Sequence, residues 1–353
     1  MGITAALIKD LAFRCGFELA GITPARPAED FARFERWQSQ GYAGEMRYMT
    51  DRRGDLRADP RNLLPSAQSI LCVGKVYRTA RENAPKNEGT KPARGRISRY
   101  ARGGDYHELM RNRLTELVNL IRERCDQPFE WRISVDTAPL LERSYARLAG
   151  LGWIGKNTCL INQQQGSWIF LGEVLLSVPL PPDSPAPARC GTCTRCIDAC
   201  PTDAIVPDGN GGWSLDSRLC ISYLTIEKRG EVPAELAART GNHLFGCDIC
   251  QEVCPWNGRA PVSDEPWFAL SAFAPLLTDL AALTEEKFRQ TFRHTPVWRA
   301  KYAGFLRNVA FAMGNSGQAE MLRPLERLAR HADPLVASSA RQALAHLKRT
   351  TPA

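Results

Sequence analysis

The stretch C-G-T-C-T-R-C-I-D-A-C-P, at residues 190–201, decides how the rest of the chain is interpreted. Its cysteines have C-x₂-C-x₂-C-x₃-C-P spacing, in which three thiolates bind one iron–sulfur cluster and the fourth binds a second cluster. Another run, C-D-I-C-Q-E-V-C-P at residues 247–255, follows it, and Cys220 lies between the two. The spacing therefore predicts two 4Fe-4S clusters and a protein that transfers electrons one at a time.

Eight cysteines in these segments can supply two sites of four thiolates each. We expect one cluster to be held by Cys190, Cys193, Cys196 and Cys254, and the other by Cys200, Cys220, Cys247 and Cys250. Zinc sites usually carry two C-x₂₋₄-C pairs and no triple run, and disulfide frameworks are typical of short secreted chains. The remaining cysteines are expected to be small buried hydrophobes: Cys15, Cys72, Cys125 and Cys159.

The chain of 353 residues has room for two or three domains. Strand-like and helix-like segments alternate up to about residue 180, and P-L-P-P-D-S-P-A-P-A at residues 179–188 is typical of a linker. We predict an α+β multidomain protein with three parts: an α/β cofactor-binding catalytic domain over 1–182, a ferredoxin-like two-cluster domain over 183–260, and HEAT-like helical repeats over 261–353. A plain helical cap is the alternative for the last part.

Several elements of the first domain are predicted from local patterns. Helices are expected at residues 4–16, 30–38, 106–124 and 139–149, strands at 18–23, 69–77, 131–135 and 167–177, and a loop after residue 38. No apolar run is long enough for a membrane span and no targeting segment is recognisable, so we expect a soluble cytoplasmic protein.

The net charge of +8 is unevenly distributed. Five basic residues and no acidic one lie between Gly89 and Gly104: Lys91, Arg94, Arg96, Arg99 and Arg102. Such a stretch suits a polyanion such as nucleic acid, and a solvated loop is an equally good interpretation.

The segment between Asp136 and Asn157 is the best candidate for a catalytic site. Asp136 follows a predicted strand, where ligand-facing side chains collect in α/β sheets, although a helix cap explains it equally well. Gly150, Gly152 and Gly155 permit close approach of the backbone to a bulky group. Neither a dinucleotide-binding glycine motif nor a phosphate-binding loop is present in the sequence.

Five phrases, in the same order, resemble the epoxyqueuosine reductase family, which performs the last step of queuosine biosynthesis in tRNA. They are S-R-Y-A-R-G-G-D-Y-H at 98–107, S-V-D-T-A-P-L-L-E-R at 134–143, G-W-I-G-K-N-T at 152–158, R-L-C-I-S-Y-L-T-I-E at 218–227 and the paired cysteine runs that end in C-P-W-N at 254–257. The resemblance covers nearly the whole chain.

The resemblance implies a cobalamin cofactor in its base-off form, with no protein ligand on cobalt, and a relay of electrons to it through both clusters. It implies Asp136 as the general acid, with its neutral form favoured by desolvation. The implied cofactor-binding residues are Arg57, Arg99, Tyr100, Asp136, Lys156, Asn157, Thr158 and Ser222.

The implied partners are the anticodon stem-loop of a tRNA carrying epoxyqueuosine and a low-potential electron donor such as a flavodoxin or ferredoxin. We expect the arginines of the basic stretch and Lys156 to contact phosphates or corrin side chains, and Lys301, Arg307 and Arg323 to cradle the tRNA stem. A monomer is expected.

Two other classes share part of this pattern. A cobalamin-dependent reductive dehalogenase also combines a corrin with two clusters, but such enzymes usually carry an export signal and a membrane anchor. A non-enzymatic electron carrier would not need the phrases between residues 134 and 158 and would bind no corrin. The sequence leaves open whether reduced cobalt attacks the epoxide or only relays electrons.

Overall fold

The computed structural model describes residues 3–79, 93–268 and 274–350, so Lys91 of the basic stretch lies outside the described residues. At its centre is a four-stranded sheet in the order β1-β2-β7-β4, in which every neighbouring pair is antiparallel. The strands are β1 (Leu19–Pro24), β2 (Ser69–Val76), β4 (Trp131–Ser134) and β7 (Ile169–Leu176). An α/β domain would have a mostly parallel sheet, so the expected α/β arrangement of this part is corrected to α+β.

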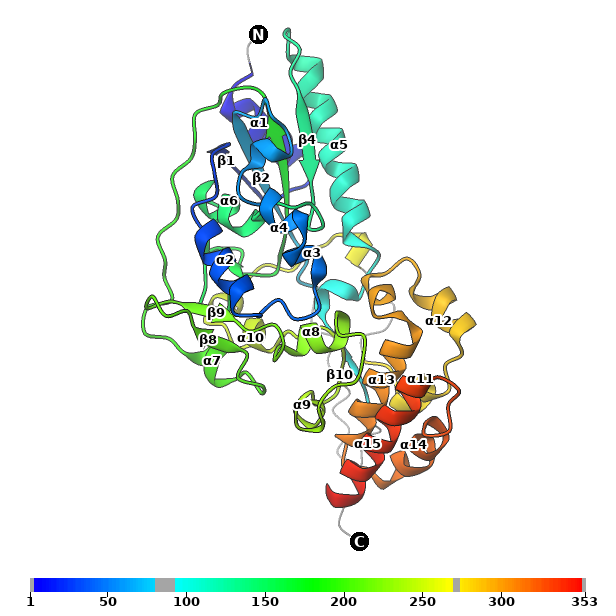
Figure 1. The fold of residues 1–353 in the computed structure, drawn as a ribbon. Helices are drawn as coiled ribbons and strands as arrows, with labels where there is room; N and C mark the ends of the chain where they lie inside the picture. The colour runs from blue at the N-terminus through cyan, green and yellow to red at the C-terminus, as the bar shows by residue number, and fades with distance from the viewer. Residues whose placement is uncertain (1–2, 80–92, 269–273, 351–353) are drawn as a thin grey trace.

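Helices cover both faces of this sheet (Figure 1). Helices α1 (Ala5–Arg14) and α5 (Tyr106–Arg124) pack on one face, against Leu71 and Val73 of β2. Helix α6 (Glu142–Leu148) packs on the other face, against Ile70 and Cys72. Strand β2 is buried at every position because successive side chains enter opposite cores, and it therefore appears in the sequence as one continuous apolar run.

The helix boundaries follow from local capping. The Thr4 side chain accepts a hydrogen bond from Leu7 N at 3.2 Å and begins α1 where the sequence predicts it, as Asp105 does for α5. Helix α2 (Phe31–Ser39) also agrees with the prediction. The expected loop after residue 38 instead contains α3 (Arg47–Thr50) and α4 (Arg52–Leu56), with Asp51 capping α4. Helix α6 begins at Glu142, three residues later than predicted.

The cysteine runs each lead into a single helical turn, α7 (Arg195–Asp198) and α10 (Ile249–Glu252), and these two turns pack together. Between them lie the hairpin β8 (Ile205–Pro207) and β9 (Trp213–Leu215), helices α8 (Ile221–Ile226) and α9 (Ala234–Arg239), and strand β10 (His243–Phe245). Strand β10 pairs in parallel with β3 (Arg96–Ile97), and a second hairpin joins β5 (Trp153–Ile154) to β6 (Leu160–Ile161).

The C-terminal helices form a separate lobe in Figure 1, yet they share a hydrophobic core with the cysteine-rich part. They are α11 (Leu277–Ala281), α12 (Glu285–Phe292), α13 (Lys301–Gly314), α14 (Leu322–Leu328) and α15 (Pro334–Thr350). Leu224 of α8 and Phe245 of β10 belong to the same buried cluster as Phe305 of α13 and Leu347 of α15. The two parts are therefore fixed to each other by apolar contacts.

In the described part of the chain, no helix is both long enough and apolar enough to cross a membrane.

Candidate active site

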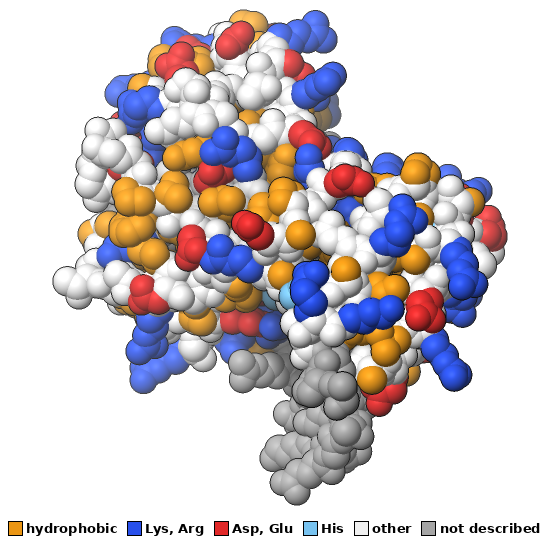
Figure 2. All heavy atoms as spheres, turned by 60° about the horizontal axis from the view of Figure 1, so that its bottom comes forward, with side chains coloured by type: hydrophobic (Ala, Val, Ile, Leu, Met, Phe, Trp, Pro, Cys, Tyr) orange, Lys and Arg blue, Asp and Glu red, His pale blue; other side chains and the backbone are white. Residues whose placement is uncertain are grey.

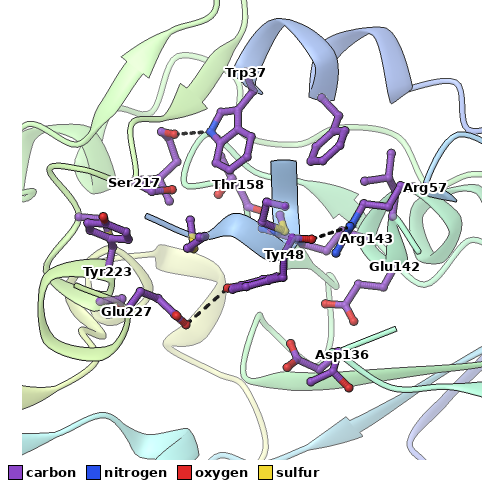
Figure 3. Close-up of a pocket in the computed structure, with 18 of the residues that line it drawn as sticks. Trp37, Tyr48, Arg57, Asp136, Glu142, Arg143, Thr158, Ser217, Tyr223 and Glu227 are labelled. Atoms are coloured by element: carbon purple, nitrogen blue, oxygen red, sulfur yellow. Dashed lines mark hydrogen bonds between the residues drawn. The ribbon is translucent and has the colours of Figure 1, made fainter. Parts of the chain in front are cut away.

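A cavity of about 930 Å³ opens between helices α2, α3 and α4 on one side and helices α6 and α8 on the other. This is the size range of small-molecule and cofactor sites. Its wall combines acidic, aromatic and basic side chains from segments far apart in the sequence, several of which are drawn in Figure 3. We call it the central pocket; the lining residues that matter below are Tyr48, Arg57, Tyr100, Tyr106, Asp136, Glu142, Arg143, Thr158, Cys220, Ser222 and Arg299.

Asp136 lies directly beyond the end of β4, on the pocket wall. Its backbone φ of 44° is in the left-handed region, and so is that of Thr158, at 62°, on the same wall. Non-glycine residues adopt this conformation at a cost, and such residues concentrate at functional sites. The strained turn presents the Asp136 carboxyl group to the cavity while 40% of its side chain stays exposed.

His107 connects Asp136 to Asp105. One ring nitrogen of His107 lies 2.9 Å from Asp136 Oδ2, and the other lies 2.6 Å from Asp105 Oδ1. Burial disfavours the charged imidazole, but the two carboxylates outweigh burial and raise the pKa of His107 to about 9. Burial also acts to raise the pKa of Asp136, whereas the hydrogen bond and charge of His107 prevail and lower it. At neutral pH the shared proton therefore resides on His107.

This result corrects the expectation that desolvation keeps Asp136 neutral. Residues Tyr106 and His107 stack face to face, with ring centroids 4.1 Å apart, and Tyr106 stacks on Phe170 of β7. The aromatic stack fixes His107 in line with Asp136. An ionised Asp136 paired with a protonated His107 is thus the resting state of this pair.

Glu142 is a second acidic group of the pocket, at the N-terminus of α6. Its carboxylate accepts a hydrogen bond from the backbone N–H of Asp136, and its side chain points toward Asp136 in Figure 3. Burial is the largest cause of the change in its pKa, and the charge of Asp136 adds to it; together they raise the pKa of Glu142 to about 7. The pocket therefore contains two carboxyl groups with opposite pKa shifts, an arrangement that can separate acid from base roles.

Two arginines of the pocket contact Tyr48. The Arg57 guanidinium is 5% exposed and donates hydrogen bonds to the carbonyl oxygens of Tyr48 and Arg53, at 3.2 and 2.6 Å. Arg299 pairs with Glu227 at 2.8 Å and lies over the Tyr48 ring. These arginines hold the aromatic wall of the pocket in place and leave cationic charge beside it.

The cysteines of the two runs come together in the two predicted sets. Burial is the main cause that raises the pKa of Cys196 to about 11, and the neighbouring thiols of Cys254, Cys190 and Cys193 contribute. The thiol of Cys247 has Cys220 and Cys200 as electrostatic neighbours, and that of Cys250 has Cys220 and Cys247. None of the twelve cysteines of the chain forms a disulfide. The thiols of each predicted set are therefore electrostatic neighbours, and Cys220 of the second set lines the central pocket.

The turn that carries Thr158 is tied to the second cysteine set. Asn157 donates a hydrogen bond to the Cys250 carbonyl oxygen, and the Cys159 thiol is hydrogen-bonded to the Cys250 thiol. Cys159 was expected to be a small buried hydrophobe, as were Cys15, Cys72 and Cys125; Cys15 and Cys72 are buried, whereas Cys125 is only partly buried at the C-terminal end of α5. Cys159 instead contacts a candidate cluster ligand.

The structure brings five of the predicted cofactor-binding residues to the central pocket: Arg57, Tyr100, Asp136, Thr158 and Ser222. Arg99, Lys156 and Asn157 do not line it. Arg99 lies over the Trp168 ring at 5.2 Å, and its backbone N–H donates to Asp248.

The arginines of the basic stretch are engaged within the protein. Arg94 donates to the Ala274 carbonyl oxygen, Arg96 pairs with Glu252 at 2.7 Å, and Arg102 is buried and donates to the Ile97 carbonyl oxygen. Burial withdraws Arg102 from a surface role, whereas Arg94 is exposed, so a phosphate contact by the rest of this stretch stays a prediction. Figure 2 shows Lys and Arg side chains spread over the displayed face with acidic side chains between them.

Three features of the site were missed in the sequence. His107 could have been found from its place at the end of D-Y-H, in a phrase already singled out, and Glu142 from its place in L-L-E-R. Tyr48 and Arg299 are 251 positions apart and carry no local signal.

Comparison with known proteins identifies the class first. The family model described as "4Fe-4S double cluster binding domain" matches residues 189–257, so the protein is an iron–sulfur protein with a two-cluster domain. The family model described as "Epoxyqueuosine reductase QueG, DUF1730" matches residues 57–137. The epoxyqueuosine reductase of Xanthomonas campestris is 44% identical over 325 residues, which cover 91% of this chain and 90% of that protein.

Solved structures agree with this relationship. A crystal structure of epoxyqueuosine reductase with an epoxyqueuosine-modified tRNA-Tyr stem loop matches with a TM-score of 0.88 and 30% identity, over 97% of this chain and 89% of that one. The epoxyqueuosine reductase of Bacillus subtilis, with its catalytic aspartate loop swung out of the active site, matches with a TM-score of 0.86 and 29% identity, over 97% and 90%. The chain belongs to the epoxyqueuosine reductase family of oxidoreductases, as its sequence motifs predict.

Proposed function

We propose that this protein reduces epoxyqueuosine to queuosine at the wobble position of tRNA. The observation that carries the proposal is the central pocket, in which Asp136, on a strained turn, and Cys220, in the second cysteine set, share one cavity wall. A proton-transferring group and a cluster ligand beside one cavity are what a reductive deoxygenation requires. The relatives named above, one of them with a modified tRNA stem loop, support the choice of substrate.

Cobalamin is the cofactor that we propose for the central pocket. The cavity of about 930 Å³ offers room for a large group, and no histidine is among the described residues that line it. Arg57, Tyr100, Thr158 and Ser222 would hold the corrin, in its base-off form without a protein ligand on cobalt. Bound there, cobalamin would supply the strongly reducing cobalt centre that opening of the epoxide needs.

The two cysteine sets support an electron path into the pocket. The set with Cys220 adjoins the cavity, whereas Cys190, Cys193, Cys196 and Cys254 of the other set do not line it. We propose that a low-potential donor such as a flavodoxin or ferredoxin reduces the cluster of the outer set, which then reduces the inner one. The fixed packing of α7 on α10 would keep the two clusters at a constant separation.

Asp136 is the proposed proton donor to the oxygen released from the epoxide. In the resting protein its proton is held by His107, 2.9 Å away, so the two residues act as one unit that stores and delivers a proton. Breaking a carbon–oxygen bond leaves an alkoxide, and protonating it in the transition state contributes about 10²–10⁴-fold to the rate. The Asp136 turn can aim this proton because its left-handed backbone directs the side chain into the cavity.

The domain division at about residues 182 and 260 and the HEAT-like character of the C-terminal helices are also part of this proposal. Helices α13 and α15 pack against each other with α14 beside them, as in a helical repeat. Lys301 and Arg323 on these helices are exposed and are candidates to contact the tRNA stem, whereas Arg307 is 1% exposed and is withdrawn from that role. We propose that the protein acts as a monomer.

The proposed function is tested with protein purified without oxygen and with reconstituted clusters. We expect loss of one oxygen from epoxyqueuosine in tRNA, dependent on added cobalamin and a low-potential reductant and measured by mass spectrometry of the digested nucleosides. Asp136→Asn should lower turnover by about 10²–10⁴-fold, whereas Asp10→Asn, on the exposed face of α1, should not change it. Full turnover in Asp136→Asn contradicts the role of Asp136. If the protein binds cobalamin but does not convert the tRNA, the pocket acts on another substrate, as in a reductive dehalogenase. If the protein binds no cobalamin, the result favours an electron carrier.

A further inference from the structure

The deoxygenation of an epoxide consumes two protons as well as two electrons. The epoxide loses its oxygen as water and becomes an alkene: both carbon–oxygen bonds break, the low-potential donor supplies two electrons, and the oxygen takes up two protons. The Asp136–His107 pair holds one exchangeable proton at neutral pH. A second proton has to come from another group of the pocket or from water.

We propose that Glu142 supplies this second proton, by reprotonating Asp136 within the central pocket. The inference rests on the proposed function. Glu142 accepts a hydrogen bond from the Asp136 backbone N–H, both side chains line the same cavity, and Figure 3 shows the Glu142 carboxyl group directed toward Asp136. Glu142 acts through Asp136 and is therefore a positioning and proton-supplying residue.

A third carboxyl group, that of Glu173, interacts electrostatically with Glu142 and Asp136. Glu173 of β7 is 1% exposed, and its Oε1 atom has no hydrogen-bond partner among the described residues. It pairs in register with Cys72 on one side and with Ser134, two residues before Asp136, on the other. Burial, with smaller contributions from Glu142 and Asp136, raises the pKa of Glu173 well above its usual range, so this carboxyl group is neutral at physiological pH.

The groups around Glu142 decide when it holds its proton. The charge of Asp136 opposes its ionisation, and the neutral Glu173 carboxyl group and the buried Cys72 thiol are the other titratable groups nearby. Arg143 and His107 favour ionisation, and Arg57 and Tyr106 face Glu142 from α4 and α5. Burial prevails over the cations and raises the pKa of Glu142 to about 7, which suits a group that must give up and regain a proton near neutral pH.

The test compares the wild-type protein with Glu142→Gln, Glu142→Asp and, as a matched control, Glu123→Gln on the exposed end of α5. Turnover of epoxyqueuosine tRNA is measured from pH 6 to 9 with saturating cobalamin and reductant. We expect Glu142→Gln to be about 100-fold slower below pH 7, with a deficit that shrinks at higher pH because the wild-type carboxyl group is then ionised too. Glu142→Asp should restore part of the rate, and Glu123→Gln should match the wild type.

A second readout uses the protein without cobalamin. Infrared difference spectra recorded across the same pH range should contain a protonated-carboxyl band that disappears as the pH rises through about 7 and is missing in Glu142→Gln. An unchanged pH profile in Glu142→Gln, or an infrared band that does not depend on Glu142, overturns the inference. A thermal melt of each variant shows whether it is folded. Absence of turnover in the wild-type protein itself contradicts the proposed function, which separates the two failures.

Discussion

Asp136 shows how a neighbouring side chain reverses the effect of burial. From the sequence alone, an aspartate in a closed pocket is expected to have a raised pKa. In the structure His107, 29 residues earlier in the chain, reaches Asp136 and lowers that pKa, and Asp105 holds the other ring nitrogen of the same histidine. The acid of the pocket is therefore best described as a pair of residues.

Replacing His107 by Gln should change both pH dependence and stability. The pKa of His107 is raised in the folded protein from about 6.5 to about 9, so its ion pairs stabilise the fold fully below pH 6.5, and this contribution is lost as the pH rises toward 9. We expect His107→Gln to lower the free energy of unfolding by on the order of 2 kcal/mol at pH 6 and by less at pH 9. Urea unfolding at both pH values measures it. An equal loss at both would show that folding does not raise the pKa of His107. His331→Gln in the C-terminal helices is the control.

At the scale of elements, helix α13 is joined to α8 by a buried arginine. The Arg307 guanidinium donates to the carbonyl oxygens of Lys228 and Gly230, both at 2.8 Å, and of Leu224, at 2.5 Å. Asn308 next to it donates to the carbonyl oxygens of Thr225 and Leu244. Burial lowers the pKa of Arg307 to about 10, so it remains charged while it satisfies one carbonyl group of α8 and two in the segment that follows it. The pocket wall that contains Ser222 thus depends on a helix from the other end of the chain.

Replacing Arg307 by Met should destabilise the protein strongly. The apolar side chain fills much of the space, but it leaves three buried carbonyl oxygens without donors, and we expect a loss of about 3 kcal/mol in the free energy of unfolding. Arg323→Met, on the exposed face of α14, should change it by less than about 0.5 kcal/mol. Thermal and denaturant unfolding of both variants measure the difference. Equal stability of the two would show that water replaces the arginine.

At the scale of the whole molecule, the C-terminal helices are part of the structure that holds the clusters. Phe305 and Leu347 share a core with Leu224 and Phe245, which flank the second cysteine set. Deleting these helices would expose that core, so the loss of tRNA binding in a truncated protein would not reveal a direct contact. Exchange of surface charges is the sharper experiment.

The double variant Lys301→Glu, Arg323→Glu should weaken tRNA binding if this face contacts the stem. Affinity for tRNA falls as the salt concentration rises, so a plot of log affinity against log salt concentration has a negative slope. Each lost phosphate contact makes that slope shallower by about 1. The matched control reverses two exposed charges at the far end of α5, Arg122→Glu and Arg124→Glu. Fluorescence titrations of labelled tRNA at several salt concentrations measure the slopes. Identical slopes in both double variants would assign the stem to another face.

The sequence by itself determined the parts whose information is local. Cysteine spacing predicted the two-cluster domain, which the family model confirms, and alternation and capping predicted α1, α2, α5, β2 and β7 to within two residues. The phrase around Asp136 marked one wall of the pocket. Thiolate spacing, helix caps and the apolar pattern of a buried strand each involve residues only a few positions apart. A short stretch of sequence is therefore enough to predict them.

Only the tertiary structure decided how these parts meet. It made the sheet antiparallel, buried Arg102, paired Arg96 with Glu252, and placed His107 and Glu142 beside Asp136. Charge in a sequence does not show whether a side chain finds a carbonyl oxygen, a carboxylate or water. Those partners are brought together by burial of apolar surface across the whole chain, and they set the charge state of each group in the pocket.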